Sequence, residues 1–183
     1  MPCDPHSPAR PIFLIGYRCT GKTTTGRLLA QKLARPFVDT DQTLETDEGI
    51  TIARMVDTFG WAHFRQAETR TLLALDLGQG PVVATGGGII LAEENRRFLQ
   101  EQGIAVWLQA DAQTIMARLT ADAASADSRP DLTRQSLEDE TRQMLALRNP
   151  LYETLARITI NTAAHSPEAA ADLIKRRLDH ERL

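Results

Sequence analysis

The 183-residue sequence has few of several residues on which particular classes of protein depend. Two cysteines, Cys3 and Cys19, are too few for a disulfide framework. The four histidines show no spacing typical of metal ligands. A net charge of −3 gives no basic surface for nucleic acid, and no apolar run is long enough to span a membrane. We therefore expect a cytoplasmic protein, monomeric, without nucleic acid or membrane partners.

Lysine is also scarce: only three are present, so arginine supplies most of the 21 basic residues. Guanidinium groups suit phosphates and carboxylates because their N–H groups form a planar fork. Residues 1–11 carry four prolines and no apolar segment, which predicts a disordered tail and not a signal peptide. The remaining residues, 12–183, have the length of a single domain.

The most specific local pattern runs from Gly16 to Thr23 and matches the phosphate-binding sequence G-x-x-x-x-G-K-[ST]. Successive backbone N–H groups in such a loop form a concave anion site. We predict that Lys22 reaches the β- and γ-phosphates of ATP and that the Thr23 hydroxyl binds Mg²⁺. The predicted nucleotide contacts in this segment are Gly16, Cys19, Thr20, Gly21, Lys22, Thr23 and Thr24. A glycine-rich turn before an ordinary helix is the alternative.

Short apolar segments alternate with segments of helical pattern along the chain. The predicted strands are 12–15, 36–39, 81–85, 104–108 and 157–161. The predicted helices are 23–34, 51–58, 61–77, 93–101, 111–120, 136–147 and 167–180. Strands with so few polar residues are typical of strands buried on both faces. The sequence predicts an α/β fold of the P-loop NTPase type, a five-stranded parallel sheet with helices on both faces.

Ligands of such sheets bind beyond the carboxyl ends of the strands. Asp39 ends the strand at 36–39 and Asp41 lies two residues on, whereas the strand at 81–85 ends in Thr85 and lacks the usual acidic residue. We predict that Asp39 lies near Mg²⁺, through water, and that Asp41 binds an acceptor hydroxyl and takes its proton. The alternative is that both carboxylates only cap the following helix, near Thr43.

Three further features could complete an acceptor site. Gly86–Gly88 exposes backbone N–H groups with no side chain in the way, although a plain flexible turn would have the same sequence. Arg65 could bind a substrate carboxylate while Glu68, three residues on, holds it; a surface ion pair is the alternative. Arg148, at the end of the helix predicted at 136–147, could be a second carboxylate clamp or could cap that helix.

The segment at 121–135 lacks a core-forming period and contains Pro130. A segment of this length inside a compact domain predicts a lid, with a floppy surface insertion as the alternative. In a lid, Arg129 could close over the phosphates and offset the charge of the transition state.

From Ile12 to about Leu178 the chain resembles the shikimate kinase family, and it is most similar to the type II enzymes. The resemblance rests on the order and approximate spacing of several motifs, not on any one alone. They are the phosphate loop, Phe37-Val38-Asp39-Thr40-Asp41, Trp61-x-x-Phe64-Arg65-x-x-Glu68, Ala84-Thr85-Gly86-Gly87-Gly88-Ile89-Ile90, Arg129-Pro130-x-Leu132 and Arg148-x-x-x-Tyr152.

The resemblance implies ATP-dependent phosphorylation of the 3-hydroxyl of shikimate, in the route to aromatic amino acids. It implies that Asp41 is the base, that Arg65 and Arg148 hold the shikimate carboxylate, and that Arg118 and Pro167 enclose the adenine. It further implies a substrate-binding region at about 40–78 and a lid at about 121–135. Gly86, Gly87 and Gly88 belong to the implied shikimate site, Lys22 and Arg129 to the implied catalytic groups, and Thr23 and Asp39 to the metal site.

One departure from the family and two rival functions stay open. Cys19 stands where the family usually has glycine, which could tighten the loop and weaken ATP binding. A gluconate-type or nucleotide kinase would share the same scaffold, because a fold alone does not select the acceptor. A catalytically silent regulatory or binding protein could also have kept the pocket.

Overall fold

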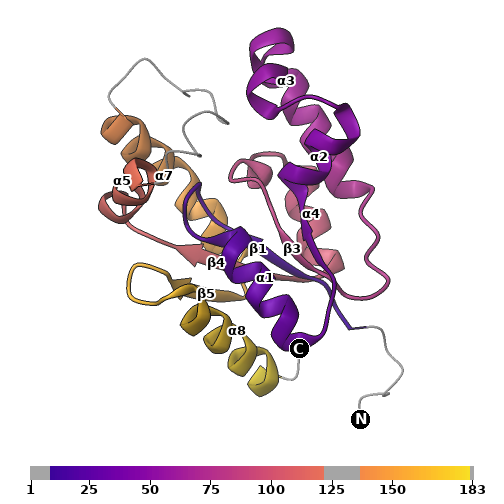
Figure 1. The fold of residues 1–183 in the computed structure, drawn as a ribbon, viewed down its shortest axis with the longest axis vertical. Helices are drawn as coiled ribbons and strands as arrows, with labels where there is room; N and C mark the ends of the chain where they lie inside the picture. The colour runs from indigo at the N-terminus through magenta and orange to yellow at the C-terminus, as the bar shows by residue number, and fades with distance from the viewer. Residues whose placement is uncertain (1–8, 122–136, 182–183) are drawn as a thin grey trace.

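The computed structural model describes residues 9–121 and 137–181. Its strands form one parallel sheet in the order β2-β3-β1-β4-β5 (Figure 1). The strands are β1 (Ile12–Ile15), β2 (Phe37–Asp39), β3 (Val82–Ala84), β4 (Ile104–Gln109) and β5 (Ile158–Asn161). All five predicted strands are present, so the predicted α/β fold is confirmed.

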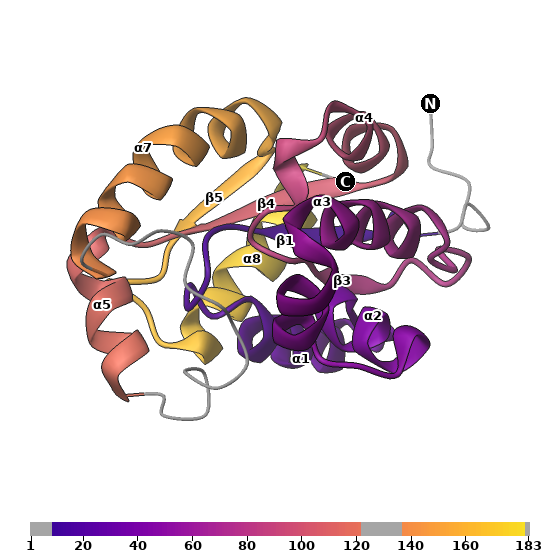
Figure 2. The ribbon, with the colours of Figure 1, turned by 90° about the horizontal axis from the view of Figure 1, so that it is seen from above.

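Helices cover both faces of the sheet, with α1 and α8 on one face and α3, α4 and α7 on the other (Figure 2). The helices are α1 (Lys22–Leu33), α2 (Thr40–Glu48), α3 (Ile52–Leu73), α4 (Glu93–Gln102), α5 (Ala112–Ala121), α7 (Leu137–Leu155), α8 (Pro167–Glu181) and the 3₁₀ helix η1 (Ile89–Leu91). Two apolar cores result, one on each side of the strands.

Strand β1 shows how the sheet separates these cores. Ile12 and Leu14 pack in the core beneath α1 and α8, whereas Phe13 and Ile15 pack on the opposite side. Because successive side chains of a strand point to opposite faces, a strand covered on both faces must be apolar throughout. All four side chains are fully buried, which holds the phosphate loop that follows β1 on a rigid base.

The region between β2 and β3 differs in part from its prediction. Helix α2 begins directly after β2 and was not among the predicted helices. The helices predicted at 51–58 and 61–77 are present as the two arms of α3, which meet at Gly60 with a φ of 80°, but the second arm ends at Leu73. Together α2 and α3 enclose a small apolar cluster of their own, separate from the two cores of the sheet.

The prediction for α7 was wrong at its carboxyl end. The helix was expected to stop at residue 147, before Asn149-Pro150, but it continues through Pro150 to Leu155. Proline removes one backbone N–H bond and disfavours a helix interior. Here Tyr152 is fully buried and stacks on Trp107 of β4, so core packing holds the helix together. Arg148 therefore lies inside the helix, and the helix-capping alternative for it is wrong.

Parts of two predicted segments lie outside the described residues. These are residues 1–8 of the predicted tail and residues 122–135 of the predicted lid, including Arg129, so both segments stay predictions. Among the helices that are described, none combines the length and the hydropathy needed to cross a membrane.

Candidate active site

The phosphate loop connects β1 to α1 and owes its path to glycine. Gly16 has a φ of 141°, and a Cβ there would lie 2.4 Å from the Leu108 carbonyl oxygen. Gly21, at the amino end of α1, has a φ of 89°. The Lys22 Nζ donates to the carbonyl oxygens of Gly16 and Tyr17 at 2.9 and 2.7 Å. The lysine is thus folded back along the loop, at the helix terminus where anions bind.

Cys19 occupies an unusual position within this loop. Its φ is 58°, in the left-handed region that favours glycine. Its carbonyl oxygen accepts a 3.1 Å hydrogen bond from Arg118 Nη1 on α5. The departure from the family pattern therefore coincides with the backbone geometry for which a glycine would be better suited.

Thr23 and Asp39 meet at the base of the loop. Thr23 Oγ1 donates to Asp39 Oδ2 at 2.7 Å. The other oxygen of Asp39 accepts from the backbone N–H groups of Asp41 and Gln42 at 3.1 and 3.4 Å, so Asp39 is also the N-cap of α2. The capping alternative therefore holds for Asp39, but it leaves one carboxylate oxygen beside the Thr23 hydroxyl. Such hard oxygen donors fit Mg²⁺.

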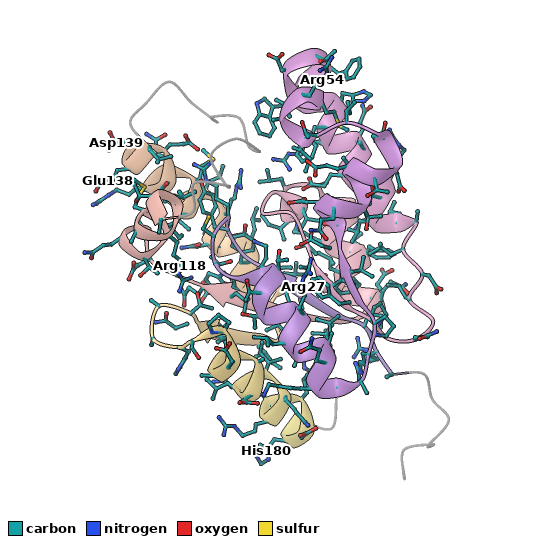
Figure 3. All side chains as sticks on the ribbon, viewed as in Figure 1. Arg27, Arg54, Arg118, Glu138, Asp139 and His180 are labelled. Atoms are coloured by element: carbon teal, nitrogen blue, oxygen red, sulfur yellow. The ribbon has the colours of Figure 1, made fainter. Side chains whose placement is uncertain are left out.

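A cavity with an empty volume of about 970 Å³ lies beside the part of the loop formed by Cys19, Thr20 and Gly21. Its lining residues are Cys19, Thr20, Gly21, Thr24, Thr25, Arg118, Ala121, Thr162, His165, Pro167 and Ala170. Arg118 and Pro167, both predicted to contact adenine, lie here together (Figure 3 labels Arg118). Gly16, Lys22 and Thr23 do not line it.

The Arg118 guanidinium also makes hydrogen bonds that the sequence did not predict. Besides Cys19, it bonds to both the side-chain and the carbonyl oxygen of Thr162, at 3.1 and 2.5 Å. Thr162 and His165 belong to the segment after β5. Arg118 consequently ties the phosphate loop to that segment.

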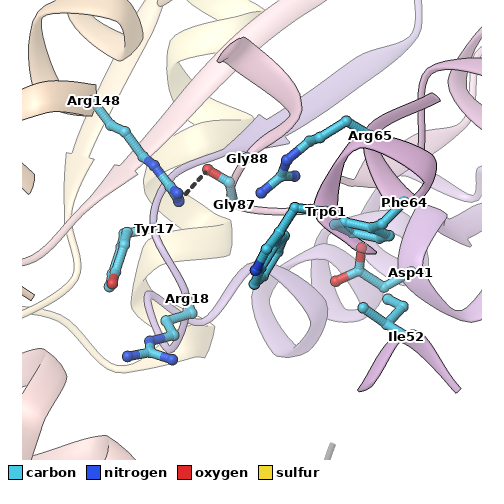
Figure 4. Close-up of a pocket in the computed structure, with 11 residues that line it drawn as sticks. Tyr17, Arg18, Asp41, Ile52, Trp61, Phe64, Arg65, Gly87, Gly88 and Arg148 are labelled. Carbon is cyan, nitrogen blue, oxygen red and sulfur yellow. Dashed lines mark hydrogen bonds between the residues drawn. The ribbon is translucent and has the colours of Figure 1, made fainter. Parts of the chain in front are cut away.

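A second cavity, of about 520 Å³, lies on the other side of the loop (Figure 4). Its lining residues are Tyr17, Arg18, Asp41, Ile52, Trp61, Phe64, Arg65, Gly86, Gly87, Gly88 and Arg148. All six residues predicted to bind the acceptor are among them.

Arg65 and Glu68 form an ion pair against the glycine turn. Arg65 Nη1 lies 2.6 Å from Glu68 Oε2, and Glu68 is 3% exposed, so the surface-pair alternative is wrong. Burial raises the pKa of the Glu68 carboxyl above its ordinary value, and the charge of Arg65 opposes that shift. A Cβ on Gly88 would lie 2.1 Å from Arg65 Nη1, so a side chain there would displace the guanidinium from its present position.

Asp41 lies in the first turn of α2 and faces the same cavity. A Cβ on Gly86 would lie 2.5 Å from Glu68 Oε1 and 2.8 Å from Asp41 Oδ1. The carboxylates of Glu68 and Asp41 thus both lie next to Gly86. The backbone N–H of Gly86 donates to the Thr40 hydroxyl at 3.1 Å, which fixes the turn to α2. The turn at Gly86–Gly88 is therefore held in place, and the alternative of a plain flexible turn is wrong.

Arg148 reaches the glycine turn from the opposite side. Its Nη1 donates to the Gly87 carbonyl oxygen at 3.2 Å (Figure 4). The Tyr152 hydroxyl donates to the same oxygen at 2.5 Å. Arg148 is 5% exposed. One turn of helix separates the two residues, so the turn at Gly87 is held by the same helix that carries the arginine.

The sequence prediction did not include Tyr17 and Arg18 of the phosphate loop, nor the ion-pair partner of Arg18. Tyr17 and Arg18 occupy variable positions of the motif, yet both are buried and line the second cavity. Arg18 Nη2 pairs with Glu140 Oε1 at 3.0 Å, across 122 positions of sequence. A charged residue inside a phosphate loop was a visible signal for Arg18. Nothing local marked Glu140.

This arrangement, a phosphate loop with a cavity on either side of it, is that of a class of protein, the P-loop phosphotransferases. Comparisons with known proteins identify its family. The family model for shikimate kinase matches residues 18–179. Shikimate kinase 2 of Escherichia fergusonii is 42% identical over 170 residues, which cover 93% of this chain and 92% of the relative. Shikimate kinase 2 of an Enterobacter strain is 45% identical over 159 residues, 87% of this chain and 90% of the relative.

Solved structures support the same family assignment. The structure of shikimate kinase from Acinetobacter baumannii in complex with shikimate is 35% identical, with a TM-score of 0.88 and 96% of each chain covered. A gluconokinase from Sinorhizobium meliloti, 18% identical with a TM-score of 0.53 over 94% of this chain and 97% of its own, shares the fold alone. The chain belongs to the shikimate kinase family. It phosphorylates shikimate, and ATP is the nucleotide substrate of this family.

Proposed function

We propose that the chain transfers the γ-phosphoryl group of ATP to the 3-hydroxyl of shikimate, with shikimate in the smaller cavity and ATP in the larger. The observation that carries this assignment is the placement of the two cavities on either side of the loop from Gly16 to Thr23. A phosphoryl group bound at the loop would lie between the two ligands, and phosphoryl transfer depends chiefly on such positioning.

The acceptor cavity has the chemistry that a hydroxylated ring acid requires. Arg148 and Arg65 supply guanidinium groups for the carboxylate, and the turn at Gly86–Gly88 supplies backbone polar groups. Asp41, which lines the far wall, would bind the ring hydroxyls and accept the proton of the attacking hydroxyl. Trp61 and Phe64 give the ring an apolar surface.

The remaining proposed roles concern ATP and Mg²⁺. Arg118 and Pro167 would enclose the adenine, and the loop N–H groups with Lys22 would bind the phosphates. Lys22 would exchange its bonds to the Gly16 and Tyr17 carbonyls for phosphate oxygens. Thr23 and Asp39 would hold Mg²⁺, directly or through water. When bound, that ion would neutralise phosphate charge.

We also propose the organisation of the chain around this reaction. A single domain at 12–183 would carry a substrate-binding region at about 40–78 and a lid at about 121–135, with Arg129 closing over the phosphates. We propose that the enzyme acts as a monomer in the cytoplasm.

The decisive experiment is a coupled ADP-release assay with Mg-ATP and one acceptor at a time. We expect ADP release that depends on shikimate, fails with gluconate and nucleoside monophosphates, and stops with EDTA. Release that depends on gluconate or a nucleotide would contradict the acceptor assignment. ATP binding without turnover of any acceptor would favour a silent regulatory protein.

Two substitutions test the proposed catalytic groups, each with a matched control on the same helix. Lys22→Ala and Asp41→Asn should nearly abolish turnover. Lys32→Ala, an exposed residue of α1 paired with Asp172, and Asp47→Asn, exposed on α2, should retain it. Full activity in Asp41→Asn would exclude its role as the base.

A further inference from the structure

The acceptor cavity contains three arginines whose positive charges are not equally available. Arg65 is paired with Glu68, and Arg18 is paired with Glu140. Arg148 has no carboxylate within ion-pair distance among residues 9–121 and 137–181; its guanidinium meets the Gly87 carbonyl and the Met144 sulfur. Of these three arginines, only Arg148 is therefore without an ion-paired carboxylate among the described residues.

The pair of Arg18 and Glu140 is the less expected of the two. Glu140 lies in the first turn of α7 and is 1% exposed, and the Arg18 side chain is 10% exposed. Toward residues 9–121 and 137–181, Arg18 donates from Nη2 only, and its buried Nε has no hydrogen-bond partner there. An arginine with spare donors in a cavity that binds an anion is a natural second anion site.

Tyr17 brings this pair close to the carboxylate clamp. Its ring lies between the two guanidinium groups in Figure 4, with its centroid 5.6 Å from Arg18 Cζ and 5.5 Å from Arg148 Cζ. Both cations thus share one aromatic neighbour, in a buried region where charge interactions are weakly screened. A change in the net charge at Arg18 will accordingly be felt by an anion at Arg148.

We propose that Glu140 is a specificity-determining residue: it neutralises Arg18 so that the acceptor cavity accepts one anionic group, at Arg148, and rejects a second. A ligand with a single carboxylate then has one favoured orientation. Inorganic phosphate and acceptors with two anionic groups are disfavoured. The inference rests on the acceptor role proposed above for this cavity, and it concerns the selection of charge within it.

The test measures inhibition by inorganic phosphate against shikimate, with ATP saturating so that the phosphate loop is occupied. Glu140→Gln keeps the shape of the side chain and an acceptor oxygen for Arg18, but removes the negative charge. We expect the inhibition constant for phosphate, competitive with shikimate, to fall by about tenfold, which corresponds to about 1.4 kcal/mol.

Two further variants separate charge from structure. Arg18→Gln combined with Glu140→Gln removes both charges, so the inhibition constant should return to within about threefold of the unmodified enzyme. A merely structural role predicts that the double variant is at least as impaired as the single one. Glu138→Gln is the matched control: Glu138 lies on the same helix, is exposed and pairs with Arg142, and should not change the constant (Figure 3).

An unchanged inhibition constant in an active Glu140→Gln enzyme overturns the proposal, as does a double variant that stays as sensitive as the single one. If Glu140→Gln does not fold, Arg18→Gln carries the test. It leaves the negative charge of Glu140, so the KM for shikimate should rise about tenfold, about 1.4 kcal/mol, and should recover in the double variant. Absence of recovery overturns the proposal.

Failure of the proposed function would look different. In that case shikimate would not bind in the smaller cavity, and Arg148→Ala would leave the KM for shikimate unchanged. Calorimetric titration of phosphate into Glu140→Gln and unmodified protein, each with a non-hydrolysable ATP analogue bound, would then still decide whether Glu140 excludes a second anion. Equal phosphate affinity in the two proteins would overturn the inference independently.

Discussion

Replacing Cys19 with glycine should stabilise this protein, because the residue is held in a backbone conformation that suits glycine. Its φ of 58° places it in the left-handed region, and its side chain is only partly buried. Ala34, the C-cap of α1, is the other non-glycine residue with positive φ within 9–121 and 137–181, at 52°, and its side chain is exposed. It offers a matched site outside the nucleotide cavity.

The magnitude follows from two opposing terms. A non-glycine residue in the left-handed region costs about 1–2 kcal/mol, whereas glycine adds freedom to the unfolded chain worth about 0.4–1 kcal/mol. The net gain is about 0.5–1 kcal/mol for each substitution. In a domain of this length, about 1 kcal/mol raises the Tm by about 2–4 °C. We therefore expect Tm increases of about 1–4 °C for Cys19→Gly and Ala34→Gly.

Calorimetry of the two single variants and the double variant, without nucleotide, measures this. The two sites lie beyond opposite ends of the 12-residue helix α1, so the gains should add. The same scans with saturating ATP ask whether Cys19→Gly also strengthens ATP binding, which Ala34→Gly should not. A lower Tm in Ala34→Gly would refute the reasoning about left-handed strain. A gain only in Ala34→Gly would mean that Cys19 makes interactions worth more than its strain.

Three other outcomes are expected. Arg148→Ala should raise the KM for shikimate by the loss of a buried charge partner, about 2–5 kcal/mol, while Arg142→Ala, exposed on the same helix, should not; an unchanged KM would exclude the clamp role. Gly86→Ala should nearly abolish shikimate binding in titrations, since its Cβ would overlap Glu68 Oε1 and Asp41 Oδ1; tight binding would mean that these carboxylates move freely. Because burial raises the folded-state pKa of Glu68, its contribution to stability is complete below its ordinary pKa of 4.5 and is lost as pH rises through the raised value. Urea unfolding at several pH values should then favour Glu68→Gln increasingly as pH rises, and a pH-independent difference would refute the shift.

Local sequence determined the parts of this protein whose function lies in one continuous segment. The loop from Gly16 to Thr23 was identifiable because its backbone N–H groups, lysine and hydroxyl need no distant partner. The strands were identifiable because burial on both faces demands unbroken apolar runs. The acidic residues at the end of β2 and just beyond it, and the glycines after β3, could be assigned to one site because parallel strands end at the same edge of the sheet.

Only the tertiary structure decided the features that depend on distant burial. Pro150 indicated the end of a helix, but the packing of Tyr152 in the core carries α7 onward, so Arg148 and Tyr152 reach the same carbonyl of Gly87. The pairing of Arg18 with Glu140 crosses 122 positions and has no local pattern. Local sequence specifies backbone chemistry within a turn or a strand. The availability of a charge depends on which partners the fold buries beside it.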